Sequence, residues 1–457
     1  MIKPYMKHLL LLSVILIITG CASTAHFPDN PPLKHADMLP SARGVSDSRN
    51  DILLALTFSG GGSRASALAY GVLEQLHETP LSADLSQRLV DEVDLISSVS
   101  GGSITAAYYG LYGDRLFSDF KSRFLDMDIE SELTAYTLNP MTLSRLSSET
   151  YGTGDVLDEF FSNLLFSDAS IDKLFDGDGP HIQINATDLF KGGRFGFTPE
   201  QFSLICSDPT AFPVSRAVAA SCAVPLLFSP VTLTNHAGSC GHVPPPWFYT
   251  ALLEDETNIR RHQRALFLNT YMDQENHPYI HLLDGGLSDN LGLRAIIDRL
   301  IEEGGVWNTL KKFNQQKARH IVIIVVNAAS ITPSKWEQSK TSPPDSAVLD
   351  AATTIPLTNY NFETMEYFRD NLPGWQKEVT NSQCREQKNC NTKPVYLIEI
   401  SLGDIPDKAL RERLTQVPTG FKLPEGSADE LINAGRELLR SDPEFIRLLK
   451  NMAMEKR

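Results

Sequence analysis

A serine among small residues, in Ser98-Val99-Ser100-Gly101-Gly102, is a candidate catalytic nucleophile. It follows a short apolar segment and precedes a helix-like stretch. This order resembles a nucleophile elbow, a strained strand-to-helix turn that exposes a serine hydroxyl. Gly102 is the small residue that such a turn needs after the serine, whereas Ser98 stands where a glycine is usual before it. The alternative is a Gly- and Ser-rich turn without catalysis.

A run of glycines, Gly60-Gly61-Gly62, could hold an anion. Consecutive glycines let the backbone approach a ligand closely and point several N–H groups at one spot. The helix expected next, which carries Arg64, adds positive potential at its N-terminus. Such a loop suits a phosphate or the oxyanion of acyl transfer, and an ordinary glycine turn is the alternative. The run lacks the features of a P-loop and of a dinucleotide-binding fingerprint.

An aspartate before two glycines, Asp284-Gly285-Gly286, could act as a base. It ends the apolar segment Tyr279–Leu283, which is a strand candidate. The carboxyl ends of strands are where open α/β sheets build their sites. The alternative is a common Asp-Gly turn.

Several short apolar segments must form the framework that positions these motifs. The predicted strands are Ile52–Phe58, Val93–Ile96, Ile182–Ala186, Ala265–Leu268, Tyr279–Leu283, Ile321–Val326 and Val395–Ile400. Helix-like stretches separate most of them, which favours an α/β fold with a mostly parallel sheet. Residues 330–356 are rich in Ser, Thr and Pro and are predicted to form a surface loop. The apolar helix expected after them is interpreted as a packing helix, with a cover over a lipid-entry mouth as the alternative.

Taken together and in this order, the three motifs resemble the patatin-like phospholipase family. The resemblance extends to residues 185–188, 217–225, 228–230 and 289–292, and it covers roughly residues 50–330. It implies a three-layer α/β sandwich with a mostly parallel central sheet and the serine on a strand-to-helix elbow. Residues 51–330 would be the catalytic domain, and residues 331–457 an extension with a loop, helices and a strand packed on the same domain.

The resemblance also implies a role for each motif residue. Ser100 would be the nucleophile and Asp284 the base of a Ser–Asp dyad. The oxyanion hole would come from the backbone amides of Gly60, Gly61 and Gly62. Supporting residues would be Arg64, Gly102, Gly285 and Gly286.

The positions of the histidines are compatible with a dyad. A Ser–Asp–His hydrolase of this chain order needs a histidine after its aspartate. Only His320 follows Asp284, and it opens a predicted strand, while strand alternation directs His281 to the face opposite Asp284. Because a free aspartate has a pKa of about 3.9, burial would have to raise it for Asp284 to act as a base.

The first residues are typical of a bacterial lipoprotein signal peptide, predicted over residues 1–20. Lys3 and Lys7 precede the apolar run Leu9–Ile18, which is too short to span a bilayer. Cys21 follows Gly20 as in a lipobox, where the peptidase cuts before a lipidated cysteine; a simple secretory signal is the alternative. Two or three acyl chains on Cys21 would anchor the protein stably. The polar, Pro-containing residues 21–50 would then be a tether.

The residue after Cys21 and the other cysteines fit an exported protein. Ala22 favours the outer membrane, so we expect a protein anchored in the bacterial cell envelope, on the periplasmic face of that membrane. An oxidising compartment permits disulfides. The predicted pairs are Cys384 with Cys390 and Cys206 with Cys240, and Cys222 is expected to be a buried free thiol.

Composition and charge exclude several classes of function. The 457 residues carry a formal net charge of −15, without long runs of Lys or Arg, which argues against a nucleic-acid partner. The cysteines lack metal-ligand spacing, and no cofactor is expected. We therefore expect a serine acyl hydrolase of phospholipase A or lysophospholipase type that cleaves lipid carboxylic esters through an acyl-enzyme. The alternatives are a general esterase or thioesterase, and a non-catalytic lipid-binding lipoprotein, which Ser98 keeps open.

Overall fold

The computed structural model describes residues 26–39, 52–81, 87–175, 179–254, 257–330, 338–386 and 393–455. The predicted signal peptide, Cys21 and Cys390 lie outside these residues. Within the described ranges, no helix is long and apolar enough to cross a membrane.

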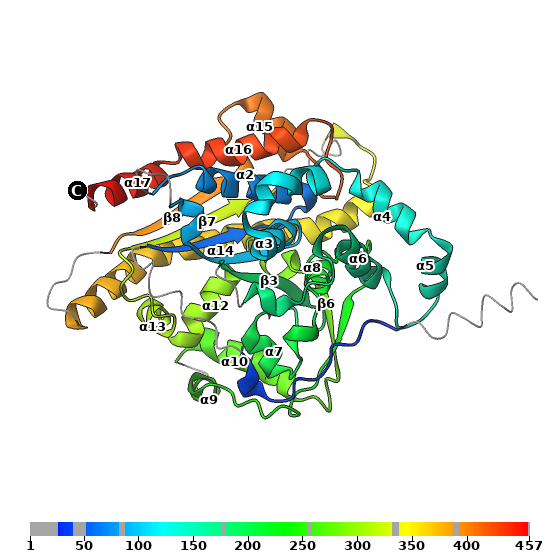
Figure 1. The fold of residues 1–457 in the computed structure, drawn as a ribbon, viewed down its shortest axis with the longest axis horizontal. Helices are drawn as coiled ribbons and strands as arrows, with labels where there is room; N and C mark the ends of the chain where they lie inside the picture. The colour runs from blue at the N-terminus through cyan, green and yellow to red at the C-terminus, as the bar shows by residue number, and fades with distance from the viewer. Residues whose placement is uncertain are drawn as a thin grey trace, which may run out of the picture.

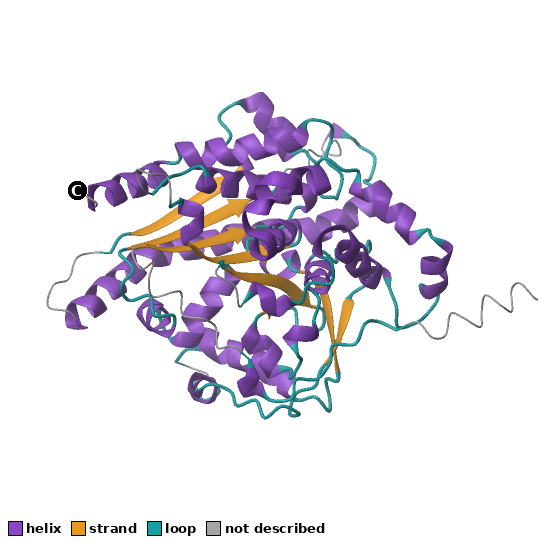
Figure 2. Cartoon of the chain, viewed as in Figure 1, coloured by secondary structure: helices purple, strands orange, loops and turns teal. Residues whose placement is uncertain are grey.

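An eight-stranded sheet forms the centre of the molecule (Figures 1 and 2). Its strands are β1 (Ile52–Phe58), β2 (Val93–Val99), β3 (His181–Asp188), β4 (Arg194–Phe197), β5 (Val231–Thr234), β6 (Tyr279–Asp284), β7 (His320–Asn327) and β8 (Val395–Ser401). The order is β5-β6-β3-β2-β1-β7-β8, and β4 also pairs with β3. The five strands from β3 to β8 in this order are parallel, whereas β4, β5 and β6 join through antiparallel pairs.

Both faces of the sheet are buried. Successive side chains of each strand point to opposite faces, and each face packs against helices. On one face, Leu54 and Phe58 of β1 belong to the large core that also contains side chains of α2 (Gly62–His77), α3 (Gly101–Tyr112), α16 (Ser427–Ser441) and α17 (Pro443–Glu455). On the other face, Ala55 of β1 packs in a second core with α12 (Arg294–Glu303) and α14 (Asp345–Glu386).

The helices therefore enclose the sheet from two sides, with α2 and α16 on one side and α12 and α13 (Val306–Lys312) on the other (Figure 1). The remaining α-helices of the described residues are α4 (Ile129–Thr137), α5 (Pro140–Arg145), α6 (Thr153–Phe161), α7 (Pro199–Leu204), α8 (Val214–Ser221), α9 (Pro246–Ala251), α10 (Ile259–Met272), α11 (Gly286–Asp289) and α15 (Lys408–Thr415). The predicted fold class, a three-layer α/β sandwich with a mostly parallel central sheet, is confirmed.

Two local predictions were wrong. The segment Ala265–Leu268 is part of α10 rather than a strand; the side chain of Asn258 caps this helix by accepting a hydrogen bond from the backbone N–H of Arg261. A short apolar run has no periodicity that separates a strand from a helix. The predicted surface loop over residues 330–356 already contains the start of α14, which continues through Pro356. The apolar residues of this helix do pack, since Met365 and Phe368 are buried.

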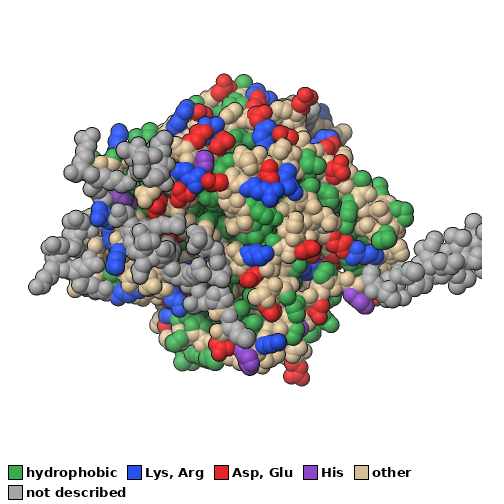
Figure 3. Space-filling model, in the orientation of Figure 1, with side chains coloured by type: hydrophobic (Ala, Val, Ile, Leu, Met, Phe, Trp, Pro, Cys, Tyr) green, Lys and Arg blue, Asp and Glu red, His purple; other side chains and the backbone are tan. Residues whose placement is uncertain are grey.

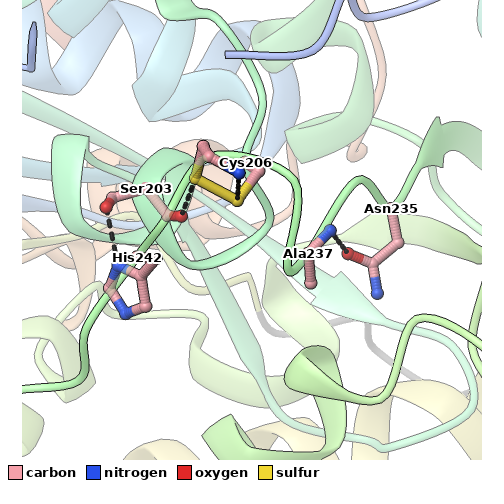
Figure 4. Close-up of a disulfide and its surroundings, with 6 residues drawn as sticks. Ser203, Cys206, Asn235, Ala237 and His242 are labelled. Atoms are coloured by element: carbon pink, nitrogen blue, oxygen red, sulfur yellow. Dashed lines mark hydrogen bonds between the residues drawn. A yellow bond between two sulfur atoms is a disulfide. The ribbon is translucent and has the colours of Figure 1, made fainter. Parts of the chain in front are cut away.

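A disulfide between Cys206 and Cys240 confirms one predicted pair (Figure 4). It lies beside the hydrogen bond between Ser203 Oγ and His242 Nδ1, at 2.6 Å. Leu33 packs on the two cysteines, and its N–H donates to the carbonyl of Cys206. Residues 26–39, within the predicted tether, thus lie along the domain.

Candidate active site

Ser100 lies on a strained turn between β2 and α3. Its φ of 49° is in the positive region that side chains other than glycine rarely adopt. Such a conformation persists only where the surroundings hold it. The backbone N–H of Ser100 donates to Ser221 Oγ at 2.8 Å, and that hydroxyl donates to the carbonyl of Asn185 at 2.6 Å. The end of α8 therefore fixes the elbow that the sequence predicts.

The residues flanking Ser100 fit the elbow sterically. A Cβ on Gly101 would lie 1.9 Å from the carbonyl oxygen of Gly62, and a Cβ on Gly102 would lie 2.7 Å from that of Ser59. Both positions therefore require glycine, because real Cβ atoms do not come this close. Ser98 is fully buried in β2 and its hydroxyl donates to the carbonyl of Gln183 at 3.3 Å. A serine thus fits where the elbow usually has a glycine.

The structure brings Asp284 directly to Ser100. Ser100 Oγ donates to Asp284 Oδ2 at 2.7 Å, and the N–H of Gly286 donates to Asp284 Oδ1 at 2.7 Å. Burial raises the pKa of Asp284 to about 6, although both hydrogen bonds favour its ionised form. The carboxylate therefore accepts a proton more readily than a free aspartate does.

The sheet and the neighbouring α8 hold Asp284 in place. Asp284 ends β6, where it pairs with Ala186 of the antiparallel β3. Its carbonyl accepts a hydrogen bond from Thr187 Oγ1 at 2.8 Å, and its N–H donates to the carbonyl of Ala223 at 2.9 Å. A Cβ on Gly285 would lie 2.3 Å from the carbonyl oxygen of Asn185, so the chain can turn away from β6 only through a glycine.

The glycine loop lies against the elbow. A Cβ on Gly60 would lie 3.3 Å from the Cβ of Ser100. The N–H of Gly60 already donates to the carbonyl of Asn290 at 3.0 Å. The amides of Gly61 and Gly62, whose φ values are positive, have no acceptor among the described residues. Two of the three predicted amides therefore make no hydrogen bond to the part of the chain that the structure describes.

Arg64 supports the loop from inside the protein. It is 2% exposed, and its Nε donates to the carbonyl of Ala328 at 2.9 Å. Its other guanidinium nitrogens donate to the carbonyl of Val417 and to Thr419 Oγ1. The guanidinium thus joins the glycine loop to the end of β7 and to the segment before α16.

Sequence reasoning missed several residues that shape the site. They are Ser221, Asn185, Thr187, Asn290 and Gly420. The first four lie within segments that carry the family resemblance. The sequence therefore indicated these segments, but it did not indicate the contacts that these residues make. Gly420 lies outside the resembling region, and no sequence signal pointed to it.

The structure does not support a catalytic thiolate or a Ser–Asp–His triad among the described residues. Cys222 is free and buried, and burial together with the charge of Asp284 raises its pKa well above the usual value. His281 pairs with Thr232 Oγ1 at 3.0 Å. His320 lies at the amino-terminal end of β7, whereas Ser100 follows the carboxyl end of β2. The described residues include no cluster of three or more metal-ligating side chains of His, Cys, Asp or Glu.

Comparisons with solved structures found human GIVD cytosolic phospholipase A2. That chain is 13% identical with a TM-score of 0.37, and the match covers 62% of this chain and 46% of that chain. The same human enzyme in complex with methyl gamma-linolenyl fluorophosphonate is 12% identical with a TM-score of 0.41, over 92% of this chain and 61% of that one. The chain thus spans less than two thirds of the length of these human chains. No curated protein matches the sequence.

The family comparison covers the three sequence motifs of the candidate site. The sequence model named Patatin-like phospholipase matches residues 56–297, just over half of the chain. This span contains the glycine loop, the elbow with Ser100, and Asp284 with its two glycines. The chain therefore belongs to the patatin-like phospholipase family.

Proposed function

We propose that this protein hydrolyses carboxylic esters of phospholipids or lysophospholipids with a Ser100–Asp284 dyad. The hydrogen bond from Ser100 Oγ to Asp284 Oδ2 carries the proposal, because it joins a nucleophile to a base at 2.7 Å. The amides of Gly61 and Gly62 lie at the start of α2, next to this pair, where an oxyanion would form.

The proposed reaction has two halves. Ser100 Oγ attacks the ester carbonyl while its proton passes to Asp284 Oδ2, and the oxyanion accepts hydrogen bonds from the two amides. The tetrahedral intermediate then expels the alcohol or lysolipid, which takes the proton from Asp284, and leaves an acyl ester on Ser100. Water attacks this ester as Asp284 accepts its proton. Release of the fatty acid returns the proton to Ser100 Oγ.

Burial makes Asp284 suitable for this work. A base is most effective when its pKa lies near the working pH, and a pKa of about 6 is close to that condition. The hydrogen bond from Gly286 occupies Oδ1 and so directs Oδ2 to the serine. Loss of one oxyanion donor typically lowers the rate by about 10²–10³-fold, so the glycine loop matters nearly as much as the dyad.

Two measurements test the proposal. The first is labelling with a fluorophosphonate, followed by mapping of the modified residue, and the second is fatty-acid release from phospholipid vesicles. We expect label on Ser100, and at least a 10³-fold loss of hydrolysis in Ser100→Ala and in Asp284→Asn. Ser118→Ala, at an exposed serine on the surface, serves as the matched control. Hydrolysis that survives both substitutions would contradict the dyad.

Two other results would identify the alternative functions. Binding of lipid without label or hydrolysis would identify a non-catalytic lipid-binding protein. Hydrolysis of p-nitrophenyl esters or thioesters, without hydrolysis of phospholipids, would identify a general esterase or thioesterase on this fold.

We also propose that Cys21 is lipidated and holds the protein on the periplasmic face of the outer membrane. His26, five residues after Cys21, pairs with Thr150 Oγ1 at 2.9 Å, close in sequence to α5. At α4 and α5 the exposed apolar residues are Leu138, Met141 and Leu143, which are 61%, 74% and 47% exposed. Hydrophobic side chains gather at this end of the face in Figure 3. An apolar surface beside the anchor supports contact with the bilayer there.

A further inference from the structure

A cavity of about 270 Å³ lies between α10, α12 and α14, outside the dyad and the glycine loop. Four arginine side chains line it, together with the carboxylate of Asp298. These arginines are Arg194, Arg260, Arg264 and Arg294. A concentration of guanidinium groups is unexpected in a chain with a net charge of −15.

Two of the arginines form the fixed base of the cavity. Arg194 Nη2 donates to Asp298 Oδ2 at 2.9 Å, and Arg264 Nε donates to Glu302 Oε1 at 2.8 Å. Both guanidiniums are largely buried, with 8% and 14% of the side chain exposed. Although burial acts in the other direction, the arginines hold the pKa of Asp298 below its usual value, so this carboxylate stays ionised. The ion pairs make the base rigid and partly neutral.

The other two arginines retain donors that can reach a ligand. Arg260 is exposed and stacks over the ring of Tyr367 at 4.1 Å, without a carboxylate partner among the described residues. The side chain of Arg294 is 35% exposed and pairs with Asp298 Oδ1 at 3.5 Å, while the backbone N–H of Arg294 donates to Asp289 Oδ2 at 2.7 Å. Within the described residues, the four guanidiniums therefore carry more charge than the carboxylates of Asp298 and Glu302, which pair with them, together with the buried Asp289 nearby.

The cavity adjoins the turn that follows Asp284. Ser288 lines it, and Ser288 Oγ lies 2.8 Å from Thr187 Oγ1, the hydroxyl that donates to the carbonyl of Asp284. Tyr360 of α14 also lines it. One helical turn earlier, Leu357 lies 3.5 Å from where a Cβ on Gly286 would be. The cavity thus adjoins residues that contact the turn after Asp284.

We propose that this cavity binds the phosphate of an anionic phospholipid headgroup while the ester of the same molecule reaches Ser100. The inference rests on the proposed function and adds a substrate class to it. Guanidinium forks match phosphate oxygens and bind them through charge-assisted hydrogen bonds. The excess positive charge disfavours a headgroup that carries an ammonium. Phosphatidylglycerol is therefore a better substrate than phosphatidylcholine.

Binding can be measured without catalysis. We expect Ser100→Ala protein to bind inorganic phosphate and sn-glycerol 3-phosphate in calorimetric titrations. Arg260→Gln, added to this protein, weakens that binding about tenfold, which corresponds to loss of one charge-assisted hydrogen bond. Arg260 is exposed and has no ion pair with any residue that the structure describes, so the variant folds, as its melting temperature will verify. Arg440→Gln removes a surface arginine of α16, 63% exposed, and is the matched control. An unchanged affinity in Arg260→Gln overturns the proposal.

Substrate preference separates a headgroup site from a site for free phosphate. The readout is the ratio of fatty-acid release from phosphatidylglycerol vesicles to release from phosphatidylcholine vesicles. We expect this ratio to fall about tenfold in Arg260→Gln and further in Arg260→Gln/Arg294→Gln. Phosphate binding with an unchanged ratio overturns the headgroup assignment. Phosphate binding by a protein that hydrolyses no ester leaves the cavity in place and contradicts the proposed function instead.

Discussion

The backbone N–H of Ser63 donates to the carbonyl of Gly420 at 2.8 Å. This bond joins the start of α2, where the glycine loop ends, to a segment beyond residue 330 that the family match does not cover. Glu130 of α4 holds the same segment from the other side, since its Oε1 accepts the N–H of Phe421 at 3.0 Å. The C-terminal extension is thus a wall of the candidate site and shapes its oxyanion loop.

Gly62→Ala should disrupt this contact. A Cβ at this position would lie 2.1 Å from the Gly420 carbonyl oxygen, and the φ of +60° is itself unfavourable for alanine. We expect kcat for ester hydrolysis to fall by at least 10²-fold, as for loss of an oxyanion donor. Gly374→Ala is the control, because nothing lies within 4 Å of its Cβ and the residue is inside α14. Equal activity of the two variants would contradict the role of the loop.

Arg64→Lys should show that a positive charge alone does not support the loop. The guanidinium reaches three acceptors, on Ala328, Val417 and Thr419, and an ammonium on a flexible stem cannot hold all three. Buried acceptors left without donors destabilise a protein by about 1–3 kcal/mol each. We expect a lower melting temperature and a fall in kcat that exceeds any rise in KM. A selective rise in KM for phospholipids would instead indicate contact with the substrate phosphate.

β1 and β7 could be predicted from sequence because each is a nearly continuous apolar run, as expected for strands buried on both faces of a sheet. β4 and β5 were not predicted, because each has only four residues. The apolar run Ala265–Leu268 has the same length and is helical. A run this short has no periodicity that distinguishes the two structures. Tertiary packing decides whether such a run forms a strand or a helix.

The same distinction applies to the candidate site. Ser100, Asp284 and the glycines could be predicted because turns require small or polar residues at neighbouring positions in the sequence. Ser221 and Gly420 act through contacts with segments far away in the chain, and a serine or a glycine alone carries no sign of such a contact. That Gly60 donates its amide to Asn290 likewise depends on how β1 and the turn after β6 meet.

The rate of ester hydrolysis should fall at acidic pH. The base must be ionised, and the pKa of Asp284 is raised to about 6 by burial. As pH falls through that value, the carboxylate takes up a proton and cannot accept one from Ser100. We expect kcat/KM for a soluble ester to decrease tenfold per pH unit below about pH 6. A profile that stays flat down to pH 4.5 would show that Asp284 is not the base.

Asp289→Asn should stabilise the protein at alkaline pH. Asp289 is fully buried, its Oδ1 has no hydrogen-bond partner, and burial raises its pKa to about 7. Between the unfolded pKa, near 3.9, and this value, the folded state binds more protons than the unfolded state, so stability falls as pH rises. The substitution removes that loss. We expect a gain on the order of 2 kcal/mol at pH 8 and little gain at pH 4, from urea unfolding.

Asp370→Asn, at an exposed position of α14, is the control for this comparison and should change stability little at either pH. A gain in Asp289→Asn that is the same at pH 4 and pH 8 would arise from packing and not from titration.

Cys21→Ser tests the proposed anchor, and substitutions in α4 and α5 test the surface beside it. Without acyl chains the protein should leave the membrane fraction, since the apolar side chains alone give weaker binding. Unchanged membrane retention would contradict lipidation at Cys21. In the lipid-free protein, Met141→Asp should weaken binding to phospholipid vesicles about tenfold, because burial of one such side chain contributes about 1.5–3 kcal/mol.

Leu253→Asp is the matched control for Met141→Asp. Leu253 follows α9 and is 86% exposed, and α9 lies far from α5 in Figure 1. If the bilayer contacts α4 and α5, only the first substitution weakens vesicle binding. Equal effects of both would mean that apolar exposure in general, and not this surface, drives the contact. Glu130 of α4 also holds the Gly420 segment against the glycine loop, so this segment would link a bilayer-bound α4 to the candidate site.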